Sequence, residues 1–286
     1  MPTISLLYDR IRTEEKLLIN TAEKKGIYLK PIDVKELHLD ITDLEKNKEI
    51  FGEIALERCI SHFRGLYLTA ILESKGILVI NPYSVVSICG NKLLTSIILT
   101  KNRVPTPRTI IAFTKEEAMK AIEELGFPSI IKPVFGSWGR LIAQIKDRDV
   151  AQAILEHREE MNNPLYQIYY IQEMIKRPPR DIRCVVVGDE IVASIYRYSG
   201  EEDWRTNIAR GGRAEVCNLD DDAKEIILKA ARAVGGGVLG VDAMESENGI
   251  VVHEVNATVE FKGAMSATGA DIPGKIIDYA LKLVKK

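Results

Sequence analysis

Three oxygen-bearing side chains, Asp242, Glu254 and Asn256, follow apolar segments near the C-terminus of this chain. Glu254 and Asn256 are two residues apart, so a strand places both on the same face. Carboxylate and amide oxygens suit Mg²⁺, which takes one or two carboxylates and keeps its other positions for water and phosphates. The trio therefore predicts a metal site beside a bound nucleotide. Solvated or capping acidic residues are the alternative.

A glycine-rich loop, FGSWGR at residues 135–140, follows the apolar segment SIIKPV. Gly136 and Gly139 can adopt backbone angles closed to other residues and turn amide groups toward phosphate oxygens. Arg140 adds positive charge, and Lys132 within the apolar segment needs a carboxylate or an anionic ligand. The loop predicts a phosphate site, although GxxxxGK[ST] is absent. A plain hairpin turn and a lysine at a strand edge are the alternatives.

Further polar residues are candidates for the same site. The segment TNIARGG, residues 206–212, joins Asn207 and Arg210 to two glycines, and Arg183 and Arg197 lie on predicted strands of the same region. Converging arginines offer the donor geometry that phosphates and carboxylates match. Each alone could be an ordinary surface or salt-bridged arginine, so the indication comes from the group.

Other residues favour simpler interpretations. Lys92 begins a predicted helix, where a solvated lysine is the local alternative to a phosphate contact. His253 adjoins Glu254, but strand alternation points it to the opposite face, so we expect a packed histidine. Trp138 and Trp204 lie beside candidate ligand loops and are expected to pack as hydrophobic lids.

Composition places the chain among globular proteins without a strong charge signal. It has 286 residues, of which 46% are hydrophobic and 28% charged, and a net charge of −2. This charge favours neither nucleic acid nor membrane as a partner. No apolar run reaches the roughly 18 residues of a membrane helix and no signal peptide begins the chain, so a cytoplasmic location is expected. The four cysteines are far apart and are expected to be reduced and structural.

The N-terminal part predicts a small parallel α/β domain over residues 1–88, because strands alternate with helices there. The next segments predict a central domain over 89–170, and the last a C-terminal domain over 171–286 with mainly antiparallel strands. No low-complexity linker separates them, so the domains should pack together. We expect strands at 3–9, 27–34, 54–60, 77–82, 129–134, 141–147, 169–175, within 181–199, and at 238–246 and 249–257. We expect helices at 13–25, 61–75, 89–101, 114–125, 148–161, 220–234 and 272–285.

Taken in order, these motifs resemble the ATP-grasp ligases over essentially the whole chain. Within that superfamily the chain is most similar to the LysW ligases, the LysX/ArgX branch related to RimK. The closer similarity rests on YDRIR (8–12), ALERC (55–59), KPVFGSWGR (132–140), TNIARGG (206–212) and EVNATVEFK (254–262). The resemblance implies an α/β ATP-grasp fold with α+β elements and an N-terminal parallel α/β pre-ATP-grasp domain.

The resemblance also implies an activity. Such a ligase uses ATP and Mg²⁺ to phosphorylate a carboxylate, and an amine then attacks the acyl-phosphate. In this branch the carboxylate is the side chain of the C-terminal glutamate of LysW, a small acidic carrier protein. The amine is the α-amino group of 2-aminoadipate in lysine synthesis or of glutamate in arginine synthesis. Family members tend to form homodimers or homotetramers, so an oligomer is expected.

Motif position implies a role for each candidate residue. The expected nucleotide contacts are Lys92, Lys132, Gly136, Ser137, Trp138, Gly139, Arg140, the adenine hinge Glu173, Met174 and Ile175, and Arg197 and Asn207. The expected Mg²⁺ ligands are Asp242, Glu254 and Asn256. Arg183, Arg210 and Lys262 are expected to serve catalysis. Arg64, Thr258, Gly263 and Ala264 are expected to contact substrates, Arg64 together with Arg103 and Arg205 as candidates to receive LysW.

The substrate segment departs from the family pattern. The family resemblance implies Asn-Thr or Asn-Asn after EFK for 2-aminoadipate and Gly-Phe for glutamate, whereas this chain has Gly263 and Ala264. Without the phenylalanine the pocket should hold one more methylene, so we predict that both amino acids are accepted. The alternatives are a RimK-like ligase or peptide ligase with other substrates, and a nucleotide-binding regulator without catalysis.

Overall fold

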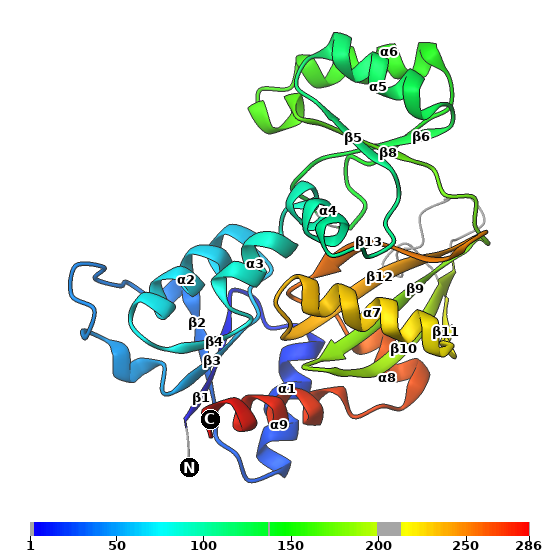
Figure 1. Cartoon of the computed structure of the whole chain (residues 1–286). Coiled ribbons are helices and arrows are strands. Elements are labelled where there is room, and N and C mark those ends of the chain that lie inside the picture. Colours follow the sequence, from blue (N-terminus) through cyan, green and yellow to red (C-terminus); the bar gives the residue numbers. More distant parts are fainter. Residues whose placement is uncertain (1–2, 137, 199–212, 286) are drawn as a thin grey trace.

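The computed structural model describes residues 3–136, 138–198 and 213–285, which form three sheets with their helices (Figure 1). The N-terminal sheet is parallel, with strand order β2-β1-β3-β4, as the alternating pattern predicted. Its elements are β1 (Ile4–Tyr8), α1 (Thr13–Lys24), β2 (Leu29–Asp33), η1 (Val34–Glu36), η2 (Lys48–Ile50), β3 (Ile54–Glu57), α2 (His62–Ser74) and β4 (Leu78–Ile80).

Two helices, α3 (Tyr83–Cys89) and α4 (Lys92–Lys101), connect this sheet to the central one. The prediction of one helix over 89–101 is wrong at its start, because Asn91 begins a new helix. The Asn91 side chain accepts hydrogen bonds from the backbone N–H groups of Leu93 and Leu94, which is N-cap geometry. The cap places Lys92 in the first turn of α4.

The central sheet is antiparallel, with order β5-β8-β6-β7, and α5 and α6 cover one of its faces (Figure 1). Thr114 caps α5 by accepting from Glu117 N. The short strand β5 was not predicted, and the expected domain boundary at residue 170 falls inside β8. The elements are β5 (Thr109–Ala112), α5 (Lys115–Leu125), β6 (Ser129–Lys132), β7 (Ala143–Ile145), α6 (Arg148–Glu159), η3 (Pro164–Gln167) and β8 (Tyr169–Glu173).

The C-terminal sheet is also antiparallel, with order β11-β10-β9-β12-β13. Helix α7 packs on one face, while α8 and α9 pack on the other. The strand β11 and the helix α8 were not predicted. The elements are β9 (Arg180–Val187), β10 (Glu190–Tyr198), β11 (Ala214–Val216), α7 (Asp221–Ala233), β12 (Val238–Ser246), β13 (Gly249–Asn256), α8 (Lys262–Thr268) and α9 (Ile272–Val284).

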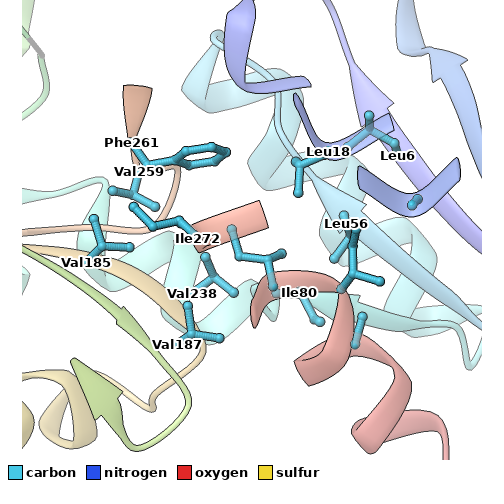
Figure 2. Close-up of a cluster of buried hydrophobic side chains, with 14 of the residues drawn as sticks. Leu6, Leu18, Leu56, Ile80, Val185, Val187, Val238, Val259, Phe261 and Ile272 are labelled. Carbon is cyan, nitrogen blue, oxygen red and sulfur yellow. The ribbon is translucent and has the colours of Figure 1, made fainter. Parts of the chain in front are cut away.

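One hydrophobic core joins the N-terminal and C-terminal parts (Figure 2). Leu6, Leu18 and Leu56 of the first sheet and α1 share it with Val185 and Val238 of the last sheet. All five side chains are buried, so separating the two parts would return apolar surface to water. The prediction that the domains pack together is confirmed for these two parts.

Among the described residues, no single helix has the length and apolar composition to cross a membrane. The consecutive pair α3 and α4 meets that test only when joined, and the two helices bend by 103° at their junction.

Candidate active site

A cleft of about 770 Å³ lies among the glycine-rich loop, the C-terminal sheet, α8 and the N-terminal part. Ser137, Asn207 and Arg210 lie outside the described residues. Arg64 is on α2, where its Nη1 lies 3.3 Å from Asp9 Oδ2, and it is not among the cleft residues. The predicted site residues that line the cleft are Lys92, Lys132, Gly136, Trp138, Gly139, Arg140, Glu173, Met174, Ile175, Arg183, Arg197, Asp242, Glu254, Asn256, Thr258, Lys262, Gly263 and Ala264.

One face of the C-terminal sheet packs in the core at one end and lines the cleft at the other, because alternate residues of each strand point to the same face. On β9, Val185 and Val187 are in the core shared with the N-terminal part, and Arg183 lies further along the same face. On β12, Val238 packs in that core and Asp242 follows on the same face. The apolar half of each strand therefore fixes the position of its charged half.

The oxygen trio comes together across the β12–β13 pair. Asp242 lies directly opposite Glu254, and Asn256 lies opposite Gly240. The Asn256 amide nitrogen donates to Asp242 Oδ2 at 3.2 Å. Rotation of the Asn256 side-chain amide would exchange the positions of its nitrogen and its oxygen, which differ little in shape. The amide oxygen would then be available as a metal ligand.

Asp242 is buried and surrounded by positive charge. Its Oδ1 lies 2.6 Å from Arg183 Nε and 3.1 Å from Arg197 Nη2, yet no hydrogen bond of good geometry reaches it from the described residues. Burial raises the pKa of Asp242 to about 6, against the lowering effect of the two arginines. An incompletely satisfied buried carboxylate oxygen next to Glu254 is suited to a hard cation.

In the described part of the chain, no three histidine, cysteine or acidic side chains lie together in a way that could hold a metal ion. The trio contains two carboxylates and one amide, which is the sparse ligand set with which Mg²⁺ combines water and phosphate oxygens. The residues present therefore fit Mg²⁺ bound together with a nucleotide.

Lys132 ends β6 as a buried lysine. Its Nζ donates to the Gln172 side-chain oxygen at 2.6 Å, a neutral partner. Burial lowers its pKa to about 8, with Glu254 opposing the shift and Lys92 adding to it. A cation held in this way gains stability from an incoming phosphate, because the phosphate supplies the charge that a neutral amide does not.

Lys92 joins helix α4 to the glycine-rich loop. Its Nζ donates to the Gly136 carbonyl at 2.7 Å and lies 3.7 Å from Glu254 Oε1, and its backbone N–H donates to the Val134 carbonyl at 2.9 Å. The lysine is buried rather than solvated. Two cations, Lys92 and Lys132, therefore lie on the loop side of the oxygen trio.

The glycine-rich loop has left-handed backbone at several positions. Gly136 has φ 140° and Gly139 has φ 66°, while Trp138 has φ 57°. Glycine adopts such angles without strain, which explains its use here. The Trp138 indole nitrogen donates to Glu260 Oε1 at 3.4 Å, and the Arg140 guanidinium lies 5.0 Å from the Trp138 ring. The loop is thereby connected to the segment before α8.

The predicted hinge, Glu173 to Ile175, follows β8 where the chain leaves the central sheet. Arg108 N donates to Glu173 Oε1 at 2.6 Å, and Glu173 N donates to the Arg108 carbonyl at 2.9 Å. The Gln144 amide nitrogen lies 2.9 Å from the Met174 sulfur. These contacts hold the predicted hinge at the wall of the cleft.

Arg197 belongs to a buried ion-pair network. It donates to both carboxylate oxygens of Asp181, at 2.8 and 2.7 Å. Burial acts to lower its pKa, but Asp242 and Asp181 outweigh it and raise the pKa of Arg197 above its ordinary value. Gly240 of β12 lies on the same face of the sheet. A Cβ at this position would clash with Arg183 Nη1, so the glycine makes room for this second arginine. The network orients Asp242 toward the cleft.

The structure corrects the orientation expected for His253, while both of its ring nitrogens are buried, as in a packed histidine. The register of β13 shifts from Glu254 opposite Asp242 to Val252 opposite Ala243, so His253 is an extra residue in a β-bulge. A bulge breaks strict alternation and re-aims a side chain. His253 lines the cleft beside Glu254, and burial with the nearby cations Lys132 and Arg197 lowers its pKa well below the ordinary value.

Sequence reasoning missed the cleft residues of the N-terminal part. Arg12 and Glu14 follow β1, and Cys59 follows β3, and all three line the cleft with Glu260. Ligands of parallel α/β sheets bind beyond the carboxyl ends of the strands. That rule, applied to the carboxyl ends of the predicted strands 3–9 and 54–60 and the residues that follow them, could have found them.

Comparisons with protein families cover nearly the whole chain. The RimK-like ATP-grasp domain matches residues 89–280, and the LysX preATP-grasp domain matches residues 4–88.

Three relatives illustrate the range of similarity. The chain is 37% identical to the alpha-aminoadipate–LysW ligase LysX of Sulfolobus acidocaldarius, over 96% of this chain and 100% of that protein. It is 38% identical to the glutamate–LysW ligase ArgX of the same organism, over 96% and 97%. It is 36% identical to the tetrahydromethanopterin:alpha-L-glutamate ligase of Methanocaldococcus jannaschii, over 72% and 71%.

Solved structures support the fold. The RimK domain ATP-grasp protein of Sphaerobacter thermophilus aligns with a TM-score of 0.76 and 24% identity, over 98% of this chain and 99% of that chain. The D-alanine–D-alanine ligase of Bacillus anthracis complexed with ATP aligns with a TM-score of 0.72 and 20% identity, over 100% and 98%. The predicted ATP-grasp architecture is confirmed.

Proposed function

We propose a function from one premise: the chain belongs to the RimK-like ATP-grasp family and carries a LysX preATP-grasp domain. It is an ATP-dependent ligase that joins the α-amino group of glutamate or 2-aminoadipate to the side-chain carboxylate of the C-terminal glutamate of LysW. The observation that carries the proposal is the end-to-end similarity to both kinds of LysW ligase, at 37% and 38% identity. The product belongs to lysine or arginine biosynthesis.

The first chemical step transfers the terminal phosphoryl group of ATP to the LysW carboxylate, which gives an acyl-phosphate and ADP. Negative charge spreads over the phosphoryl oxygens in the transition state, and fixed cations stabilise it. We assign this role to Lys92 and Lys132, because both are buried cations that line the cleft. Their positions are set by α4 and β6, so little reorganisation accompanies the reaction.

Asp242, Glu254 and Asn256 would hold Mg²⁺ with the nucleotide phosphates. The ion supplies Lewis-acid stabilisation of the transferred phosphoryl group. Arg183 and Arg197 orient Asp242 through the contacts described above. They act on the carboxylate rather than on the reacting atoms, which makes Arg183 a positioning residue in this proposal.

In the second step the amine attacks the acyl carbonyl, phosphate leaves, and the nitrogen loses a proton as the amide forms. The acyl-phosphate would react with water if the cleft were open, so exclusion of water is part of the chemistry. We assign this exclusion of water to the glycine-rich loop, of which Gly136, Trp138 and Arg140 line the cleft. Lys262 lines the same region at the start of α8 and is proposed to contact the reacting groups.

The amino-acid end of the cleft is lined by Thr258, Gly263 and Ala264. Ala264 is small and lines the cleft, so we propose that the pocket keeps space that a phenylalanine would fill. A difference of one methylene is worth about 1–3 kcal/mol. We therefore propose that the enzyme uses both glutamate and 2-aminoadipate, and that it works as a homo-oligomer.

The test is ADP release by the purified protein with ATP, Mg²⁺, purified LysW and either amino acid. LysW-dependent ADP release with both amino acids is expected. A preference for one amino acid above about a thousandfold would exclude dual use, because that ratio exceeds what one methylene provides.

A second candidate is glutamate ligation to an acceptor other than LysW. The Methanocaldococcus relative supports it, since that protein is named for a different acceptor, but it covers only 72% of this chain. ADP release with a small-molecule acceptor and glutamate, in the absence of LysW, would favour this candidate.

A further inference from the structure

We propose that Arg12 binds a substrate carboxylate that is not phosphorylated, and that Glu260 occupies the same guanidinium nitrogen when this substrate is absent. The inference rests on the proposed function and adds a recognition residue to it. Arg12 lies between β1 and α1, lines the cleft, and has a side chain only 15% exposed.

The Arg12 guanidinium is held in a fixed orientation. Its Nε donates to Glu15 Oε2 at 3.0 Å and its Nη2 donates to Glu15 Oε1 at 2.8 Å. Nη2 also donates to the Arg58 carbonyl at 3.2 Å. Glu15 is fully buried and pairs with Arg58 Nε at 3.1 Å as well, so it cannot swing into the cleft. Such an arginine is preorganised to bind an anion through its remaining nitrogen.

Within the described ranges, the remaining nitrogen of Arg12, Nη1, has one weak partner. Among the described residues its ion pair with Glu260 Oε1 spans 3.6 Å, which is beyond hydrogen-bond distance. The Glu260 side chain is 48% exposed. A carboxylate at such a distance and exposure contributes little and can be exchanged for a closer one.

The position of Nη1 points to a substrate of the ligase. Arg58 Nη1 donates to the Val259 carbonyl at 3.0 Å, and Lys262 N donates to Glu14 Oε1 at 3.1 Å. These contacts fix the segment that leads to Gly263 and Ala264 against the start of α1. Arg12 and the proposed amino-acid pocket are therefore parts of one wall of the cleft.

Charge balance explains why Glu260 should move. Arg12 and Arg58 face Glu14, Glu15 and Glu260, so a further carboxylate enters a group in which acidic side chains already outnumber the arginines. Glu14 and Glu15 are buried, whereas Glu260 is exposed and can turn to water. Since Glu260 also accepts from Trp138 Nε1, its displacement frees the loop from this contact.

Three carboxylates share this chemistry: the α-carboxylate of the amino acid, its side-chain carboxylate, and the terminal α-carboxylate of LysW. Each can be removed separately. 4-Aminobutanoate lacks the first, 2-aminobutanoate lacks the second, and LysW amidated at its C-terminal α-carboxylate lacks the third. Each analogue keeps the group that forms the new bond.

The experiment measures KM and kcat from ADP release for the wild-type enzyme, Arg12→Gln, Arg12→Lys and Glu260→Gln with these substrates. Arg12→Gln should raise KM for one intact substrate about 10- to 100-fold, the effect of a lost charged hydrogen bond. It should raise KM no more than about threefold when that substrate lacks the recognised carboxylate. Arg12→Lys should lie between, and Glu260→Gln should lower KM for the same substrate.

Arg12→Gln values that match the wild type, or that rise equally for every analogue, would overturn the inference. If Arg12→Gln does not fold, Glu260→Gln decides alone, because an exposed side chain is changed: an unaltered or raised KM would contradict the role of Glu260. A wild-type enzyme that releases no ADP with LysW and either amino acid would instead contradict the proposed function.

Discussion

The two ends of the cleft are built differently. At the end proposed to bind the phosphates, Lys132, Asp242 and Glu254 extend from strands whose other residues pack in the core. At the amino-acid end, Arg12 and Glu260 lie in connecting segments and are held by side-chain ion pairs. The chemistry shared by a ligase family needs fixed charges, whereas substrate choice can change through residues that do not support the core.

A substitution at the proposed phosphate end should have the largest effect on activity. Asp242→Asn removes a predicted Mg²⁺ ligand and the charge that Arg183 and Arg197 surround. We expect ADP release to fall at least about 100-fold, the loss typical of one fixed electrostatic group. Thermal unfolding of the variant, followed by circular dichroism, separates loss of catalysis from loss of fold. Activity within tenfold of wild type would show that the trio does not serve the reaction.

The pH dependence of ATP binding tests Lys132 at the same end. Its pKa is lowered to about 8, so the charged form is complete below that pH and is lost above it. ATP affinity should therefore be highest below about pH 8 and fall by up to about tenfold per pH unit above it. Burial raises the pKa of the cleft thiols Cys59 and Cys89, so they do not titrate in this range. Calorimetric titration with ATP should show the fall, and Lys132→Gln should flatten it.

A smaller effect is expected at the amino-acid end. Ala264→Val adds volume to the pocket that is proposed to hold the longer amino acid. The ratio of kcat/KM for glutamate to that for 2-aminoadipate should rise about tenfold, because the change is comparable to one methylene. The ATP KM should stay constant. A fall in use of both amino acids with an unchanged ratio would place Ala264 outside the selective contacts.

The smallest effect is expected outside both ends. Lys25 pairs with Asp278 at 2.7 Å between α1 and α9, and both side chains are substantially exposed. Lys25→Ala should lower the free energy of unfolding by no more than about 1 kcal/mol and leave kcat/KM unchanged. Urea unfolding and ADP release measure the two quantities. A large loss of activity would show that the contact between α1 and α9 controls the cleft.

The two ends of the cleft also differ in how well the sequence predicts them, because strand residues follow a pattern and residues in connecting segments do not. The trio was predictable because alternation and apolar neighbours determine the direction of Asp242, Glu254 and Asn256. The orientation of His253 was not predictable, because the alternation of apolar and polar residues does not reveal a β-bulge. Arg12 was missed because its environment comes from Arg58, 46 residues away, and from Glu260.

The fold shows a similar division. Long periodic segments such as α1 and α7 agree with their predictions to within a residue or two at each end. The helix α8 was missed because its seven residues, KGAMSAT, are too few to show a helical period and begin beside a glycine. The split between α3 and α4 depends on one cap at Asn91, which helical periodicity across 89–101 conceals.

The most direct test of the central claim is ADP release by the wild-type protein with ATP and Mg²⁺, measured with and without purified LysW. Glutamate and 2-aminoadipate are supplied in separate reactions, and mass spectrometry of LysW detects the added amino acid. We predict ADP release that depends on LysW, with both amino acids attached at comparable efficiency. ADP release that is independent of LysW, or LysW of unchanged mass after turnover, would contradict the proposed ligase.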